Sequence, residues 1–274
     1  MKRNILIIAA VIISMTLNAC SLNLDGETIG GKTIEGDGNI VTRTYDVTAF
    51  NEISTSLPAT VNFTIADNYS CTVSVDENLF DYLDIKVKDN ELLMGKCKDD
   101  KNKNLKATKF VIEVTAPSLE VINLAGSGTF NANSPLEAEK FEANVAGSGD
   151  IVFHKTVTTQ KVDLNVAGSG DLACNELISD ELGCYIAGSG DLKVVSGQVR
   201  KAEAGVAGSG DIVLTCNIEN LDANIAGSGD IKARVNGKLT YGIFGSGDIG
   251  YYGNPVVEGD KVGGRVKALE SPDR

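Results

Sequence analysis

The chain has 274 residues, 42% of them hydrophobic, and its 37 acidic residues outnumber its 25 Lys and Arg residues to give a net charge of −12. A chain of this size can bury a core without disulfide bonds. Its acidity would repel nucleic acid and anionic membrane surfaces, so neither is an expected partner. With one histidine and no CxxC pair, the sequence also argues against a zinc centre, and no cofactor is expected.

The first residues predict export. Lys2 and Arg3 precede an apolar run, and small residues lead into Cys20, so residues 1–19 are predicted to be a signal peptide. The sequence before Cys20 resembles a bacterial lipobox, with Cys20 carrying the lipid after cleavage. An ordinary secretory signal, in which Cys20 is incidental, is the alternative. Cleavage removes two basic residues and no acid, which leaves a charge of −14. We expect a protein anchored by lipid in the outer membrane, facing either the surface or the periplasm.

The next segments predict a tether and then strands. Residues 20–39 contain little that could form a core and are interpreted as a flexible tether. Residues 40–124 contain several short runs of alternating apolar and polar residues, which is the period of a strand. We interpret them as irregular early turns, continuous with residues 125–250. The charged stretch 96–106 within them is predicted to be a solvated loop.

A Gly-Ser-Gly corner, usually preceded by Ala and followed by Asp, dominates residues 125–250. Its serines recur at intervals that shorten from 21 to 18 residues: Ser127, Ser148, Ser169, Ser189, Ser209, Ser228 and Ser246. A regular period of this length is typical of a solenoid. Glycine supplies the positive φ of a sharp corner and allows successive backbones to approach closely.

The residues around each corner alternate as in a strand. The third residue before each serine is Leu, Val or Ile, and no helical stripe interrupts the pattern. We therefore predict an all-β fold, a right-handed parallel β-helix with about 20 residues per turn. A β-sandwich is the rival, but sandwiches do not repeat one corner sequence. The single domain would span 40–266, with 251–266 as a terminal cap and 267–274 as a tail.

An aspartate follows most corners, and stacking would align these residues about 5 Å apart. They are Asp150, Asp171, Asp191, Asp211, Asp230 and Asp248. Adjacent carboxylates would repel by about 1 kcal/mol in water, so something must offset the repulsion. We expect hydrogen bonds from backbone N–H or Ser hydroxyl groups at the same corner. The alternative is a column of bound cations such as Ca²⁺.

The sequence gives little support to catalysis. The repeated serine is not in a G-x-S-x-G motif, and only His154 could act as a base. A polysaccharide lyase or hydrolase is kept as an alternative, because the aspartate column could supply a carboxylate pair. Tyr241, Tyr251 and Tyr252 could stack on a sugar, although capping the end of the core is the simpler role. We expect no enzyme.

The cysteines do not form a disulfide framework. Five remain besides Cys20, which is an odd number: Cys71, Cys97, Cys174, Cys184 and Cys216. Cys174 and Cys184 occupy columns that other repeats fill with apolar residues, so both are interpreted as core residues. Cys71 with Cys97 is the most plausible disulfide.

A lipoprotein signal, the sequence Phe50-Asn-Glu-Ile53, the segment Val114-Thr-Ala-Pro117 and serial AGSGD corners occur in this order. Together they resemble the "head GIN domain" family of auto-transporter adhesins in Bacteroidetes-type envelope proteins, over about 40–266. The resemblance implies a single β-helix, an exported location and no catalytic residues. We expect a non-enzymatic adhesin or surface interaction module with an envelope, glycan or host-surface partner. A polysaccharide-binding protein and a periplasmic scaffold are the alternatives.

Overall fold

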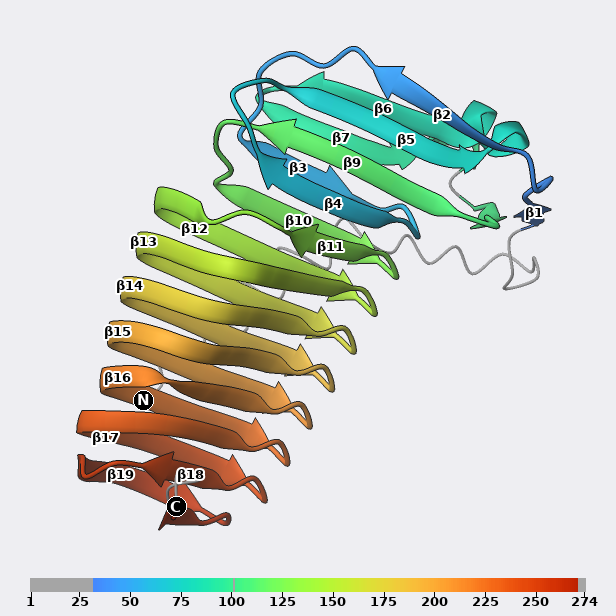
Figure 1. Cartoon of the computed structure of the whole chain (residues 1–274). Helices are drawn as coiled ribbons and strands as arrows, with labels where there is room; N and C mark the ends of the chain where they lie inside the picture. Colours follow the sequence, from blue (N-terminus) through green and yellow to red (C-terminus); the bar gives the residue numbers. More distant parts are fainter. Residues whose placement is uncertain (1–31, 101, 271–274) are drawn as a thin grey trace.

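The computed structural model describes residues 32–100 and 102–270. The predicted signal peptide, Cys20 and most of the predicted tether lie outside them. The protein is almost entirely β, with 71% strand and 3% helix. Its dominant feature is a solenoid of about seven stacked parallel turns of about 20 residues each, which confirms the predicted fold class. Figure 1 shows the turns stacked as a rod with a broader unit at the N-terminal end.

The solenoid is formed by long strands that bend around the rod, so that each strand from β13 to β17 covers most of one turn. Its strands are β10 (Val121–Gly126), β11 (Thr129–Ala132), β12 (Leu136–Gly147), β13 (Asp150–Gly168), β14 (Leu172–Gly188), β15 (Leu192–Gly208), β16 (Ile212–Gly227), β17 (Ile231–Gly245), β18 (Ile249–Tyr252), β19 (Val256–Val262) and β20 (Val266–Ala268). Equivalent residues of neighbouring turns pair in parallel, and every Gly-Ser-Gly corner stays in register with the next, as for Gly168 with Gly188.

Columns of apolar side chains fill the interior. The position three residues before each repeat serine is buried in all seven repeats, from Leu124 to Ile243. The position three residues after the serine is equally buried, from Phe130 to Ile249. Because the turns are in register, each buried side chain packs on its counterpart in the next turn, and one core runs the length of the rod.

The N-terminal unit combines solenoid-like and antiparallel pairing. Its elements are β1 (Thr33–Glu35), β2 (Ile40–Tyr45), β3 (Glu52–Thr55), β4 (Thr60–Ile65), β5 (Ser70–Asp76), the 3₁₀ helix η1 (Glu77–Tyr82), β6 (Leu83–Lys88), β7 (Glu91–Lys96), the 3₁₀ helix η2 (Lys98–Asp100), β8 (Asn104–Lys106) and β9 (Phe110–Ala116). Strands β3 and β4 stack in parallel on β10 and β11, which extends the solenoid by one turn. Strands β7 and β9 stack in parallel on β3 and β4 in turn.

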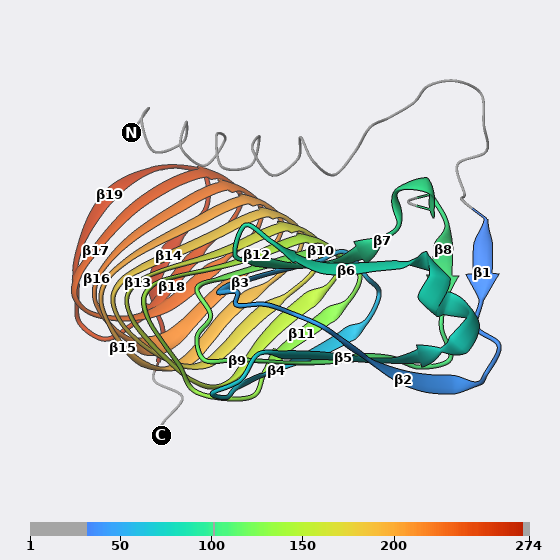
Figure 2. The same cartoon turned by 90° about the horizontal axis from the view of Figure 1, so that it is seen from above.

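Two strands of this unit, β5 and β6, run the other way. Strand β5 pairs antiparallel with β2 and β9, and β6 pairs antiparallel with β7. Asp89 and Asn90, which join β6 to β7, both have positive φ, as a tight two-residue hairpin turn requires. The segment 40–124 therefore contains two parallel layers that continue the repeats, β3 with β4 and β7 with β9, and a cap in which β5 and β6 run antiparallel to their neighbours (Figure 2).

Part of the predicted tether is ordered. Strand β1 pairs with β8, so the chain is held from Thr33 onward. The buried Asp76 carboxylate accepts hydrogen bonds from the backbone N–H groups of Gly38, at 2.8 Å, and Thr108, at 2.7 Å. The prediction of a tether reaching residue 39 thus overlooked polar contacts, which contribute no hydrophobic signal to the sequence.

The last turn closes the C-terminal end. Strand β19 pairs with β17, and β20 pairs with β18. In β19, Lys261 pairs with Ile243 and so stands at a core column position, where the preceding turns have Val or Ile. Lys261 is exposed there, and a lysine on an exposed edge strand opposes the addition of another strand. Tyr241 and Tyr251 pack against the end of the core, and Arg234 lies over the ring of Tyr252 at 5.8 Å.

Candidate functional site

The repeat serines form an exposed row along one edge of the rod. All seven side chains are exposed, and the backbone N–H of each serine from Ser148 onward donates to a glycine carbonyl of the preceding turn, as Ser189 does to Gly168 at 2.8 Å. The glycines explain the corner: Gly188 has a φ of +141°, and a Cβ on Gly190 would lie 2.0 Å from the carbonyl oxygen of Gly170. The corner sequence is therefore explained by backbone packing.

The aspartates form a ladder beside the serines. The Oδ1 atom of each accepts a hydrogen bond from the backbone N–H of the aspartate in the next turn, at 2.8 to 3.0 Å, from Asp150 through Asp230. The donor is thus in the next turn, whereas we expected it at the same corner. Because the turns stack in register, the backbone N–H of each aspartate lies within hydrogen-bond distance of the aspartate carboxylate in the preceding turn. Among the described residues, no group of three or more His, Cys, Asp or Glu side chains could hold a metal ion. The cation column stays a prediction.

A second ladder, of asparagines, was not anticipated. The Nδ2 group of Asn165 donates to Oδ1 of Asn144 at 2.9 Å, and Nδ2 of Asn144 donates to Oδ1 of Asn123 at 2.8 Å. The next residue in the column is Tyr185, whose hydroxyl lies 3.1 Å from Oε2 of Glu203. Burial, and then the charge of Glu203, raise the pKa of Tyr185. As a result, Oδ1 of Asn165 is buried without a hydrogen-bond partner. The three asparagines share one position, four residues before the serine, so the sequence does contain this signal.

The cysteines in the described residues are free thiols, including Cys71 and Cys97, so the structure does not form the disulfide that the sequence made most plausible. Cys97 instead lies 3.6 Å from the carbonyl oxygen of Asp81. Cys174 and Cys184 are buried core residues, as predicted, and so is Cys216. Burial raises the pKa of the Cys174 and Cys216 thiols to about 12, which keeps them protonated and unreactive.

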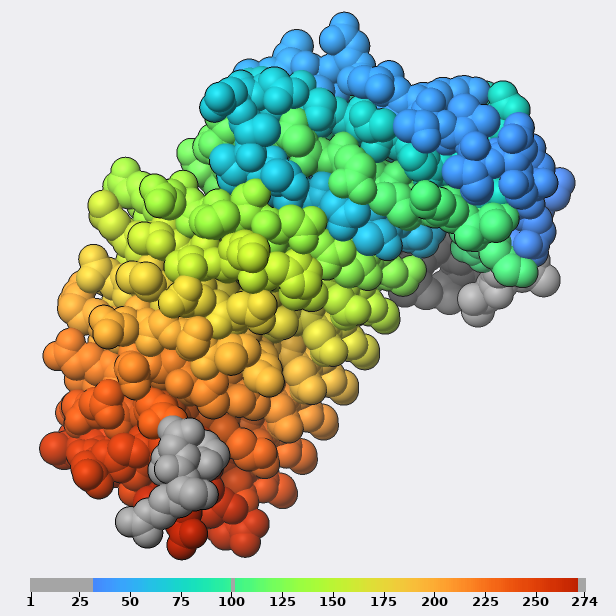
Figure 3. Space-filling model, in the orientation of Figure 1, coloured from blue at the N-terminus to red at the C-terminus, as the bar shows by residue number. Residues whose placement is uncertain are grey.

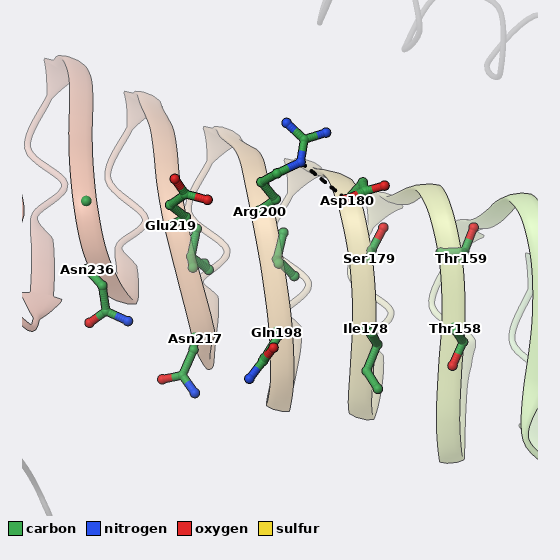
Figure 4. Close-up of a pocket in the computed structure, with 13 residues that line it drawn as sticks. Thr158, Thr159, Ile178, Ser179, Asp180, Gln198, Arg200, Asn217, Glu219 and Asn236 are labelled. Atoms are coloured by element: carbon green, nitrogen blue, oxygen red, sulfur yellow. Dashed lines mark hydrogen bonds and ion pairs between the residues drawn. The ribbon is translucent and has the colours of Figure 1, made fainter.

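A groove of about 860 Å³ follows the rod across five turns, from β13 to β17. Figure 4 shows its side chains in rows along the rod axis, with one row made of Thr158, Ile178, Gln198 and Asn217. Asn236 lies in the next turn, where the register between β16 and β17 shifts. Neighbouring turns are about 4.8 Å apart, so the five turns that line the groove span about 19 Å. The predicted serine and aspartate positions do not line this groove. The groove was not predicted, because its residues differ from turn to turn and produce no motif.

The row of Thr158, Ile178, Gln198 and Asn217 forms the first wall of the groove. The floor and the second wall have different residues. The floor is the buried row of Thr159, Ser179, Val199 and Ile218, in which the Ser179 hydroxyl donates to the carbonyl oxygen of Glu181 at 2.8 Å. The second wall is a row of Asp180, Arg200 and Glu219 (Figure 4). Arg200 lies between the two acids, and its Nε is 3.2 Å from Oδ1 of Asp180.

The first wall offers unused hydrogen-bonding groups. Gln198 and Asn217 are exposed, as is Asn236 in the next turn, and their amide groups form no hydrogen bond within residues 32–100 and 102–270. Ile178, in the same row as Gln198, is 44% exposed, which is high for a large apolar side chain. The groove can therefore supply amide donors and acceptors, one apolar contact and a largely compensated set of charges. Figure 3 shows the long flank of the rod that the turns build.

Two segments that together cover most of the chain, residues 49–172 and 144–255, match the family described as "Putative auto-transporter adhesin, head GIN domain". The chain belongs to this family. This head GIN domain protein is also similar to solved structures. A "putative lipid binding protein" from Parabacteroides distasonis is 33% identical, with a TM-score of 0.84, over 87% of this chain and 100% of that one. No curated protein matches the chain.

Two further structures are named as adhesins. A "putative adhesin" from Parabacteroides merdae is 26% identical with a TM-score of 0.80, and one from Parabacteroides distasonis is 28% identical with a TM-score of 0.81. In both cases the match covers 87% of this chain and 100% of the other. Within the described part of this head GIN domain protein, no helix is long and apolar enough to cross a membrane.

Proposed function

We propose that this protein is an exported, lipid-anchored adhesin-like module that binds its partner along the groove and catalyses no reaction. The groove is the observation that supports this most directly, because it runs across five turns of the rod and offers unused polar side chains on four of them. Family membership supports an adhesin-like role on an exported surface protein. The signal sequence and Cys20 support the lipid anchor.

The geometry suits display. The described chain begins at β1, in the N-terminal unit, and the repeats extend from this unit toward the C-terminal end (Figure 1). A lipid on Cys20 would therefore hold the capped end near a membrane and leave the grooved part of the rod projecting from it. Many weak contacts along such a rod add up when several anchored copies meet one partner.

The groove does not resemble a catalytic centre. Its two acids, Asp180 and Glu219, are separated by Arg200, which forms an ion pair with Asp180. The only histidine, His154, does not line the groove and instead contacts Oδ1 of Asn131 at 3.0 Å. These contacts favour binding over the polysaccharide-degrading alternative.

Adhesion of whole cells tests the proposal. Cells producing the protein would be compared with cells producing the double variant Gln198→Ala/Asn217→Ala, at equal amounts of protein, on immobilised envelope and extracellular-matrix material. The control is Asn175→Ala, which removes an exposed amide that does not line the groove and that donates to the carbonyl oxygen of His154 at 3.3 Å. We expect the double variant to adhere less and the control to adhere as the wild type does. Equal adhesion of all three would refute the groove as the binding surface.

A further inference from the structure

We propose that the ligand of the groove is a neutral, extended glycan that lies lengthwise along the rod, one sugar unit per turn. This inference rests on the proposed binding function and names its ligand class. It follows from three properties of the groove: its direction relative to the strands, its charge and the kind of polar groups that it exposes.

The direction of the groove disfavours an extended peptide. A peptide is commonly held by backbone hydrogen bonds to a free strand edge. The groove instead crosses the strands, and the backbone groups of β13 to β17 are used in pairing between turns, as between Gln198 and Asn217. A ligand in the groove therefore meets side chains alone. The free strand edges, where a peptide could add, lie at the two ends of the rod.

The charge disfavours an acidic ligand. The groove contains Asp180, Arg200 and Glu219, so its own balance is one negative charge, and the whole chain carries −12. Anionic polymers such as uronic acid chains would be repelled along the full length of the groove. A strongly basic ligand is also disfavoured. Asp180 already forms an ion pair with Arg200, so Glu219 is the one acid of the groove that remains for such a ligand.

The exposed polar groups match hydroxyl groups. An amide side chain offers both a donor and an acceptor, and so does each hydroxyl of a sugar. Thr158, Gln198 and Asn217 present such groups in one row, and Asn236 presents another beyond the register shift between β16 and β17. Ile178, in the same row as Gln198, adds an apolar surface for the C–H face of a sugar ring. The spacing of about 4.8 Å between turns is close to the length of one unit in an extended pyranose chain.

The lining contains no aromatic ring on which a sugar could stack. Affinity must then accumulate from successive hydrogen bonds rather than from one strong subsite. The affinity should therefore rise with the length of the oligosaccharide and level off at about five units, since five turns line the groove.

The test is calorimetric titration of the mature protein, purified in detergent from the membrane of its own cells. The probes are β-1,4-linked oligomers of glucose, mannose and xylose of increasing length, oligogalacturonates of the same lengths, and gelatin as an extended polypeptide. We expect neutral oligomers to bind with length-dependent affinity, and oligogalacturonates and gelatin not to bind. Gln198→Ala/Asn217→Ala should raise the Kd of the neutral oligomers about tenfold or more, and Asn175→Ala should leave it unchanged.

Three results would overturn the inference: tighter binding of oligogalacturonate or gelatin, no binding of any neutral oligomer, or neutral binding that the double variant leaves intact. The adhesion assay separates these from failure of the proposed function. If no neutral glycan binds but the double variant still adheres poorly, the ligand class is wrong and the groove remains the binding surface. If adhesion is also unaffected by the double variant, the proposed function is wrong as well.

Discussion

Arg265 occupies the seventh place of the aspartate column and ends it by pairing with Asp248. Its backbone carbonyl accepts the N–H of Ile249 at 2.8 Å, just as the carbonyl of Asp248 accepts the N–H of Ile231 at 3.0 Å. Its Nη2 atom lies 2.7 Å from Oδ2 of Asp248. The column of aspartates therefore ends at a positive charge. Lys261, which pairs with Ile243, lies in the same last turn.

Removing this cation should loosen the last turn. The hydrogen bond from Arg265, and to a lesser extent its charge, hold the pKa of Asp248 below its usual value, although partial burial opposes this. We expect Arg265→Ala to lower the Tm by about 2 °C, since the arginine is exposed, and Arg265→Glu to lower it further by extending the repulsion. Thermal denaturation measures both, with the exposed Lys232→Ala as control. A Tm for Arg265→Glu equal to that of the wild type would contradict this role.

Asp76 should make the N-terminal cap sensitive to acid. Burial acts to raise the pKa of its carboxyl, but hydrogen bonds from Thr108 and Gly38 outweigh burial and hold the pKa below its usual value. The carboxylate therefore contributes stability above its unfolded pKa of about 3.9, and this is lost as the pH falls through the lower folded pKa.

The variant Asp76→Asn isolates this contribution. The amide cannot accept both hydrogen bonds as the carboxylate does, so we expect a lower denaturation midpoint at pH 7 and a smaller loss of stability on acidification. Denaturation curves of both proteins between pH 7 and pH 2 test this. Parallel curves over the whole range would show that Asp76 does not hold the cap through its charge.

The corner should tolerate changes of its serine but not of its glycines. Alanine at position 190 would place Cβ 2.0 Å from the backbone carbonyl oxygen of Gly170, which has no room to move. We expect Gly190→Ala to lower the free energy of unfolding by at least about 3 kcal/mol, and Ser189→Ala, one residue earlier and exposed, by less than about 0.5 kcal/mol. Chemical denaturation compares the two. Similar values would mean that close backbone stacking does not determine the corner.

The orphaned carbonyl of Asn165 can be satisfied by extending its ladder. Asparagine at position 185 could donate to Oδ1 of Asn165, as Asn165 donates to Asn144. Leucine has nearly the same shape and no donor. We expect Tyr185→Asn to be more stable than Tyr185→Leu by about 1 kcal/mol. Denaturation midpoints decide this, and a leucine variant at least as stable would show that no ladder bond forms.

The sequence predicts the repeats well because one constraint produces them. Each corner brings backbones into contact, only glycine fits there, and the core columns must match from turn to turn. These requirements recur, so the period and the buried positions, such as Val166 and Ile186, are visible without a structure. Only part of the aspartate ladder can be predicted from the sequence. The period shows that the aspartates align, but it does not show that each carboxylate accepts its hydrogen bond from the backbone N–H of the next turn.

The cap and the groove are less predictable because no repetition marks them. The hairpin at Asp89 and Asn90 has a local signal, two turn residues between alternating runs, but the pairing of β5 with both β2 and β9 joins distant segments. The groove depends on Thr158, Gln198 and Asn217 sharing a row after a bend in each turn. Register shifts near these bends change the spacing from turn to turn, so the row cannot be counted from the serines alone.

The proposed function requires the grooved rod to face the outside of the cell, and chemical labelling of intact cells tests this exposure. A membrane-impermeant biotin reagent would be applied to intact and to lysed cells, and modification of the exposed Lys193 and Lys232 would be measured by mass spectrometry. We expect labelling of both lysines on intact cells, while a periplasmic control protein stays unlabelled. Labelling that appears only after lysis would contradict surface exposure and would place the protein on the periplasmic side of the outer membrane, as a scaffold.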